Sequence, residues 1–370
     1  MHATQHNKPS ATRAQTPVTV SLQHPAHTAQ TDVTPHVRHR PSRTWLGLCM
    51  VGLVAFGSVV SFLPRPTPAF APSRVQPQQM LINGAAQAGG NLLAAGELGH
   101  LFVSQDAGRQ WNEAAVSPQR GSTLTQVFFA NRALGLAVGH DNWILRSEDA
   151  GQSWKEANFD SEAGSALMSV WGNTAGPFFA VGSFGGFLES TDLGKTWQKR
   201  DTGLGDRHLY GVAGAGPRQM MLVGEGGLVA RSTDEGQSWT RLEDFYNGSL
   251  FGLIALSSDN WLVYGMRGKV FRSQDFGQSW QPVNSGTQLA LYGGTLTHDG
   301  RVVLVGEGGV VTVSADGGET FTLLHDGGGA SLSSVAETAD GQLMLTGQQG
   351  IALEKQPMTI EKPSTTPSNH

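Results

Sequence analysis

Hydrophobic and polar positions along residues 80–355 follow one repeating order. A leucine opens each repeat, an apolar run ending in glycine follows, and a second apolar run leads into a polar octet of the form S-x-D-x-G-x-S-W or a close variant. The octet begins at Ser104, Ser147, Ser190, Ser232, Ser273 and Ser314, so successive copies lie 43, 43, 42, 41 and 41 residues apart. The opening leucine recurs at Leu81, Leu124, Leu167, Leu209, Leu250, Leu291 and Leu332. A fixed period of this length indicates a repeat fold.

Each repeat predicts a four-stranded sheet. The apolar runs are short and are separated by glycine-containing turns, which is typical of antiparallel strands, and the tryptophan of the octet opens a fourth run. Seven such sheets in sequence predict an all-β protein, a seven-bladed β-propeller whose blades pack around a central channel. An open solenoid would need polar capping repeats, which the sequence does not show.

The seventh repeat has no octet, which leaves its outermost strand unassigned. At the expected position, 355–359, the chain reads KQPMT. Two segments are alternatives for the missing strand: Met358–Lys362, or the residues around Arg74–Gln78 before the first repeat. The second arrangement would lock the first and last blades together.

The octet itself is predicted to be a structural turn between the third and fourth strands. Its aspartate accepts hydrogen bonds from backbone N–H groups of the turn, its glycine adopts a positive φ, and its tryptophan fills the gap between neighbouring sheets. With one octet per blade, the carboxylates lie too far apart for paired acid–base catalysis. We therefore interpret these aspartates as structural and predict no catalytic residue among them: Asp106, Asp149, Asp192, Asp234, Asp275 and Asp316.

The segment before the repeats predicts export. Residues 1–43 are rich in Pro, Ser, Thr, Gln and His and are expected to be a disordered, histidine-rich cytoplasmic tail. Residues 44–63 are uncharged over a length sufficient to cross a bilayer, and arginines precede them. An uncleaved inner-membrane anchor and a secreted protein cleaved after Ala71 are alternatives. Both place the propeller in the periplasm or an equivalent compartment.

Composition sets the remaining expectations. Residues 64–79 are a proline-rich linker, 80–355 form the propeller, and 356–370 are a C-terminal tail that contains one of the two ring-closing alternatives. The net charge of −5 gives no electrostatic reason to expect nucleic acid as a partner. The single cysteine, Cys49, excludes an intramolecular disulfide and a multi-cysteine metal site. We predict no metal, no cofactor and a monomeric propeller.

The complete repeat unit, for example LVGEGGLVARSTDEGQSW at 222–239, resembles the photosystem II stability/assembly factor-like family. Members of that family are seven-bladed propellers with Asp-box turns, also called bacterial neuraminidase repeats, and the resemblance covers about 81–353. It implies an exported or lumenal domain that binds membrane proteins during assembly without catalysis. This sequence departs from the cyanobacterial members because it lacks their lipoprotein cysteine. That departure favours a bacterial relative with a membrane-protein client.

Candidate binding residues lie on the propeller face opposite the octets, where loops on a rigid scaffold carry function. They come from the turns between second and third strands and from the loops between blades: Glu97, His140, Asp141, Glu225, Arg267, Glu307, Arg207 and His208. A solvated charged rim is the alternative interpretation of these residues.

The predicted function is a non-enzymatic assembly or interaction factor for a membrane protein or a subunit of a membrane complex. The alternative is a sialidase-like glycoside hydrolase or a carbohydrate-binding propeller, although the sialidase F/Y-R-I-P motif is absent.

Overall fold

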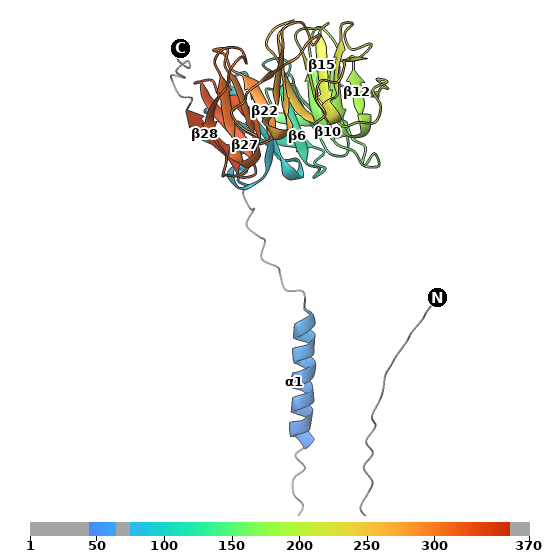
Figure 1. Ribbon diagram of the computed structural model, residues 1–370. Coiled ribbons are helices and arrows are strands. Elements are labelled where there is room, and N and C mark those ends of the chain that lie inside the picture. The colour runs from blue at the N-terminus through green and yellow to red at the C-terminus, as the bar shows by residue number, and fades with distance from the viewer. Residues whose placement is uncertain (1–43, 64–74, 356–370) are drawn as a thin grey trace, which may run out of the picture. The chain divides into compact units, whose positions relative to one another are not determined.

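The computed structural model describes residues 44–63 and 75–355, which fall into two units, 1–73 and 74–370 (Figure 1). In the first unit, α1 (Thr44–Phe62) is an uncharged helix whose large apolar side chains are exposed. By length and composition it is a helix that fits a bilayer, and a signal sequence near an N-terminus has the same properties. The predictions for 1–43 and for 356–370 concern segments outside the described residues.

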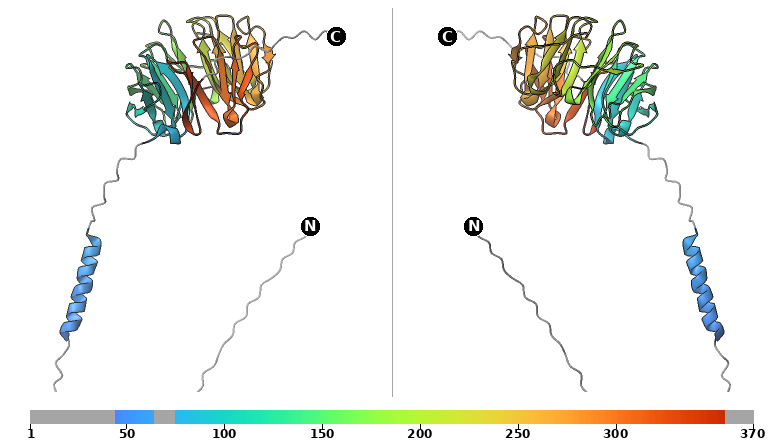
Figure 2. Two further views of the ribbon diagram at one scale, coloured as in Figure 1. Left: turned by 90° about the vertical axis from the view of Figure 1, so that its left-hand side faces the viewer. Right: turned by 90° about the vertical axis from the view of Figure 1, so that its right-hand side faces the viewer.

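The second unit is a ring of antiparallel sheets, so the predicted all-β, seven-bladed propeller is confirmed (Figures 1 and 2). Within each blade the strands follow chain order from the channel outward. The strands of the first three blades are β1 (Ile82–Ala88), β2 (Asn91–Gly96), β3 (Leu101–Ser104) and β4 (Asn112–Glu113); β6 (Leu124–Phe129), β7 (Gly135–Gly139), β8 (Ile144–Ser147) and β9 (Ser153–Asn158); β10 (Leu167–Gly172), β11 (Phe178–Gly182), β12 (Phe187–Ser190) and β13 (Gln198–Lys199). Those of the last four are β14 (Leu209–Gly214), β15 (Met220–Gly224), β16 (Val229–Ser232) and β17 (Thr240–Arg241); β18 (Leu250–Ala255), β19 (Trp261–Gly265), β20 (Val270–Ser273) and β21 (Gln281–Val283); β22 (Leu291–Leu296), β23 (Val302–Gly306), β24 (Val311–Ser314) and β25 (Thr322–His325); β26 (Leu332–Glu337), β27 (Gln342–Gly347) and β28 (Gly350–Lys355).

Two blades depart from the predicted four strands. The second blade has five, because β5 (Ala115–Ser117) leaves the first blade and pairs in parallel with β9. The seventh blade has three strands among the described residues.

The inner strand of every blade starts with a bulge, one residue after the aliphatic residue that opens the repeat. In six blades this is the predicted leucine. In the first blade it is Ile82, which pairs with Gly96 and is fully buried, so the prediction of Leu81 was wrong by one residue. Both residues are apolar, and only the pairing register distinguishes them.

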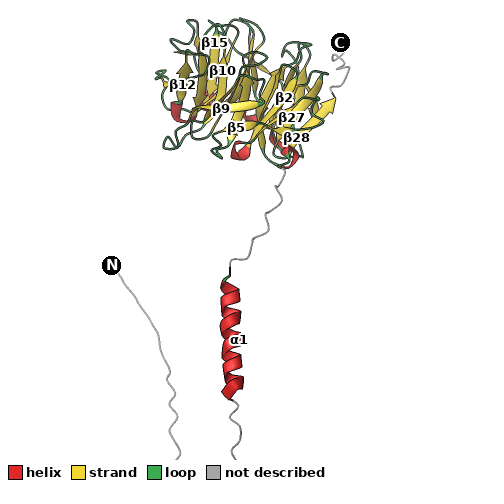
Figure 3. Ribbon diagram, turned by 180° about the vertical axis from the view of Figure 1, so that it is seen from behind, coloured by secondary structure: helices red, strands yellow, loops and turns green. Residues whose placement is uncertain are grey.

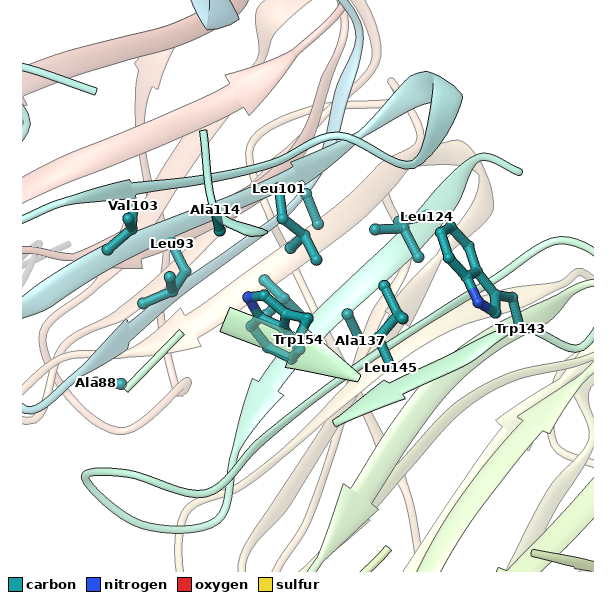
Figure 4. Close-up of a cluster of buried hydrophobic side chains, with 12 residues drawn as sticks. Ala88, Leu93, Leu101, Val103, Ala114, Leu124, Ala137, Trp143, Leu145 and Trp154 are labelled. Atoms are coloured by element: carbon teal, nitrogen blue, oxygen red, sulfur yellow. The ribbon is translucent and has the colours of Figure 1, made fainter. Parts of the chain in front are cut away.

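The octets join neighbouring blades. Trp154 is 1% exposed and lies between the first and second blades, beside Leu93, Ala137 and Leu145 (Figure 4). Across the blade boundary, a side chain at Gly151 would overlap Leu93 of the preceding blade. The octet glycines Gly194, Gly236 and Gly318 lie in the same way against the second strand of the blade before them. Close packing at these glycines therefore repeats around the ring.

Arginines that directly precede the octet serine also link their own blade to the next one. Arg146, Arg231 and Arg272 each donate to a backbone carbonyl in the octet of the next blade, at 2.8, 2.8 and 3.0 Å. The R-S dipeptide of the repeat is thus a link between blades.

The ring closes through packing between the first and last blades. Leu92 of the first blade is buried against Ala336 and Met344 of the seventh, and the octet glycine Gly108 lies against Leu353 of β28. The segment proposed around Arg74–Gln78 adds no strand within its described part: Pro77–Gln79 forms a 3-10 turn that contacts the start of β28. Residues 75–79 therefore give no support to that alternative. The other segment, Met358–Lys362, lies outside the described residues.

Candidate functional site: the channel mouth and its turns

The turns between second and third strands share one construction and lie along one rim of the ring, several of them as the short helices in Figure 3. In all seven blades, the first residue of the turn donates its N–H to the carbonyl of the residue just before the inner strand. Those donors are Glu97, His140, Ser183, Glu225, Met266, Glu307 and Gln348, with N–O distances of 2.8 to 3.1 Å. Since adjacent strands are antiparallel, these turns lie at the opposite end of each blade from the octets.

The turn glutamates have a local structural contact. The carboxylates of Glu97, Glu225 and Glu307 accept the N–H of the residue before the inner strand, at 3.1, 3.3 and 3.1 Å. Gln348 makes the same contact in the seventh blade with its amide oxygen, at 3.1 Å. One carboxylate oxygen therefore holds the turn, and the other is left to face solvent or a ligand.

The second blade has a different turn. Asp141 and Asn142 both have positive φ, and the Asp141 carboxylate accepts the Ser122 hydroxyl at 2.5 Å. His140 is exposed beside them. The structure thus places both candidates on the rim, with Asp141 occupied in a loop contact.

Arg207 and His208 precede the inner strand of the fourth blade and lie against the turns of two blades. The Nδ1 atom of His208 accepts the backbone N–H of Phe184 at 3.2 Å, and the two rings lie 4.9 Å apart. Arg207 donates to the Gly226 carbonyl at 3.5 Å. Arg267 is exposed on the turn of the fifth blade at positive φ.

The octet aspartates lie at the other end of the blades and bind their own turns. In the second octet, the Asp149 carboxylate accepts the Ser153 N–H at 2.9 Å, the Ser153 hydroxyl at 2.5 Å and the Ser147 hydroxyl at 2.8 Å. In the fourth, hydrogen bonds from the Ser238 hydroxyl and then the Ser238 N–H hold the pKa of Asp234 at about 2. These contacts satisfy the carboxylates locally, as expected for a turn residue.

An arc of aromatic side chains lines one side of the channel mouth. It runs from Phe184 through His208, Tyr210 and Phe251 to Tyr292, with neighbouring ring centroids 4.9 to 6.2 Å apart. The last three are the bulged residues of the fourth, fifth and sixth inner strands. The corresponding residues of the seventh, first and second blades are polar: Ser333, Asn83 and Thr125. The mouth therefore has an aromatic side and a polar side.

Residues 147–301 match the family model described as photosynthesis system II assembly factor YCF48. The resemblance predicted from the repeat unit is confirmed. No curated protein matches the chain by sequence. Among solved structures, YCF48 bound to a D1 peptide is 19% identical, with a TM-score of 0.59 over 75% of this chain and 93% of that one.

YCF48 from Cyanidioschyzon merolae is 16% identical, with a TM-score of 0.60 over 77% of this chain and 98% of that chain. A GH74 xyloglucanase from Xanthomonas campestris is 12% identical, with a TM-score of 0.58 over 74% of this chain and 52% of the xyloglucanase. At such identities these structures establish the propeller fold, which YCF48 and a hydrolase share.

The binding residues predicted from the sequence did not include Tyr264, nor the channel residues Tyr210, Phe251 and Tyr292. For Tyr210, Phe251 and Tyr292 a sequence signal existed: each directly follows the leucine that opens its repeat, and it becomes the bulged residue that faces the channel. Ordinary strand alternation hides this position, because a bulge changes which side chains point inward.

Proposed function

We propose that this protein is a membrane-associated, non-enzymatic factor that binds a membrane protein or membrane complex on the exported side of the membrane. It binds with the propeller face that carries the turns between second and third strands. The match to the YCF48 family and the apolar helix α1 support this proposal. The observation that carries it is the exposure of large apolar side chains on that face. They lie at backbone positions that glycine occupies in other blades, so the fold does not require a side chain there.

Phe184 is 67% exposed and Leu98 is 61% exposed, and both have φ of 54°. The equivalent positions in the fourth and sixth blades are Gly226 and Gly308, the residue type that tolerates positive φ without strain. A leucine or phenylalanine there adds backbone strain and exposes apolar surface, with little burial in return. Such a cost is expected where the side chain serves binding.

Crosslinking of the full chain in native membranes, followed by purification and identification of captured proteins, tests this proposal. We expect Phe184→Asn and Leu98→Asn to lose the captured membrane protein. Leu193→Asn is the matched control: Leu193 is also apolar, is 38% exposed and has φ of 62°, but it lies in an octet at the other end of its blade. Capture of no membrane protein above background, or equal loss in all three variants, would contradict the proposal.

A carbohydrate-active or carbohydrate-binding propeller is the second candidate, favoured by the aromatic side of the channel, since aromatic faces pack against apolar surfaces. A general acid for glycoside hydrolysis needs a raised pKa. Among the described carboxyl groups with a shifted pKa, every shift is downward. Turnover of xyloglucan, or of fluorogenic sialosides and glucosides, by the purified protein would favour this second candidate.

A further inference from the structure

The channel contains a cavity of about 190 Å³ with two unlike sides. Tyr210, Phe251 and Tyr292 present aromatic rings from three successive blades, and Asn83, Thr125 and Ser333 present amide and hydroxyl groups. No charged side chain lines this cavity among the described residues. A volume of this size accommodates one side chain of a partner rather than a folded segment.

Tyr264 reaches this cavity from the second strand of the fifth blade. Its side chain is 4% exposed, it lines the cavity, and its hydroxyl has no hydrogen-bond partner among the residues that the structure describes. Burial alone raises the pKa of this hydroxyl, so it stays protonated at neutral pH. A hydroxyl that faces a cavity and has no protein partner is available to a ligand.

The fold makes room for Tyr264 by a paired change that the other blades lack. In the other six blades, the position of Tyr264 is occupied by smaller side chains: Ala95, Val138, Val181, Val223, Val305 and Thr346. On the neighbouring inner strand, Gly294 replaces the alanine, valine or leucine of the other blades, and a Cβ there would lie 3.1 Å from the Tyr264 hydroxyl. A side chain at Gly252 would overlap that hydroxyl. A tyrosine flanked by two glycines is therefore particular to this side of the channel.

The charged groups that shift the pKa of Tyr210 and of Tyr292 are negative. Burial raises the pKa of Tyr210, and Glu225 adds to the rise; burial and then Glu307 raise the pKa of Tyr292. Burial raises the pKa of Tyr246, which packs on Phe271 outside the cavity, and Arg267, the cation on the turn of the fifth blade, partly opposes that rise. Aromatic faces next to carboxylates attract a cation.

We propose that the aromatic side of the channel mouth binds a cationic side chain, an arginine or lysine presented by a partner polypeptide. The cation lies over the rings of Tyr292, Phe251 and Tyr210, with Glu307 and Glu225 balancing its charge and the Tyr264 hydroxyl accepting one of its N–H groups. An arginine fits best, because its planar guanidinium stacks on rings and is weakly hydrated. The inference rests on the proposed function only for the source of the side chain, a membrane-protein partner.

The chain holds four tyrosines, and three of them line the cavity, so ¹⁹F NMR of the 3-fluorotyrosine-labelled full chain in detergent observes the site directly. Each resonance is assigned by a Tyr→Phe variant. The probes are the peptide acetyl-Gly-Ser-Arg-Ser-Gly-amide and the same peptide with citrulline, a neutral isostere, in place of arginine.

We expect the arginine peptide to shift the resonances of Tyr210, Tyr264 and Tyr292 and to leave Tyr246 unchanged. The citrulline peptide should give no shift at the same concentration. Higher ionic strength should weaken binding, because the attraction involves partly exposed charges.

Variants locate the determinants. Glu225→Gln with Glu307→Gln removes both charges but keeps the turn contact, as Gln348 does in the seventh blade, and should weaken peptide binding about fivefold. Glu235→Gln, a partly exposed glutamate in the octet at the other end of the fourth blade, is the control and should have no effect. Tyr264→Phe removes only the hydroxyl and should weaken binding about tenfold, read from the two remaining channel tyrosines.

Equal binding of the citrulline peptide, shifts confined to Tyr246, or unchanged affinity in the double glutamine variant would each overturn the inference. A negative peptide result together with successful capture of a membrane protein rejects only the cationic site. Peptide binding without capture of any membrane protein rejects the proposed function and leaves the site standing.

Discussion

Trp154 and Trp239 occupy the same octet position and differ in one hydrogen bond, which makes them a matched pair. Both indoles are more than 90% buried, and each packs edge to face on a phenylalanine. The Nε1–H of Trp154 donates to the Gly151 carbonyl at 3.0 Å. The Nε1–H of Trp239 is buried without a partner among the described residues. Phenylalanine is tolerated at this position, because Phe321 occupies it in the sixth blade.

Trp154→Phe should therefore destabilise the propeller more than Trp239→Phe. The loss of ring size is shared by both variants and largely cancels in the comparison. Removing a satisfied hydrogen bond costs about 1 kcal/mol, and removing an unsatisfied buried donor returns about 1 kcal/mol or more. The two variants should then differ by about 2 kcal/mol, which corresponds to a difference in Tm of about 4 °C for a domain of this size.

Calorimetric and denaturant unfolding of both variants and of the parent protein measure this difference, with circular dichroism of the native state as the check on folding. Equal destabilisation, or a larger loss in Trp239→Phe, would refute the hydrogen-bond reasoning. In that case the two indoles would differ mainly in packing.

Three further predictions concern the turns and the octets. Gly236→Ala should destabilise the propeller by at least about 2 kcal/mol more than Gly300→Ala, because both have positive φ but only the first overlaps a side chain, Phe179, and thermal unfolding measures the difference. The folded pKa of Asp234 is about 2 against an ordinary 3.8, so its contribution to stability is full above about pH 5 and is lost as the pH falls through 2. Asp234→Asn should accordingly lower the free energy of unfolding at pH 7 and flatten its decline in acid titrations, and an unchanged pH profile would contradict this sign. Glu97→Ala should lose about 1 kcal/mol of stability through the lost contact to a turn N–H, whereas Glu97→Gln should unfold like the parent, and an equal effect of the two would exclude the turn contact as the cause.

The octets and the seven repeats could be predicted from the sequence because their contacts are local. In each octet, serine, aspartate and glycine bond within a few residues of one another, as Ser147, Asp149 and Gly151 do. Such contacts require the same residue types at the same spacing in every copy, and repetition makes the pattern visible.

Other features depend on contacts between distant residues and left no periodic trace. The binding candidates Glu225 and Glu307 were found as charged turn residues, but their contact to the preceding loop depends on how two turns meet in space. Closure of the ring through Leu92, Ala336 and Met344 joins residues about 250 positions apart. Tertiary packing decided these contacts.

The sequence by itself determined the propeller, its blade number and the structural role of the octets, because local turn chemistry and apolar alternation repeat there. Only the tertiary structure showed that Tyr210, Phe251 and Tyr292 form one aromatic surface, and that Gly294 makes room for Tyr264 beside them. Tyr210, Phe251 and Tyr292 share one register position in three successive blades, whereas Tyr264 and Gly294 each depart from the repeat in one blade. These residues form one surface only when the ring brings neighbouring blades together around the channel.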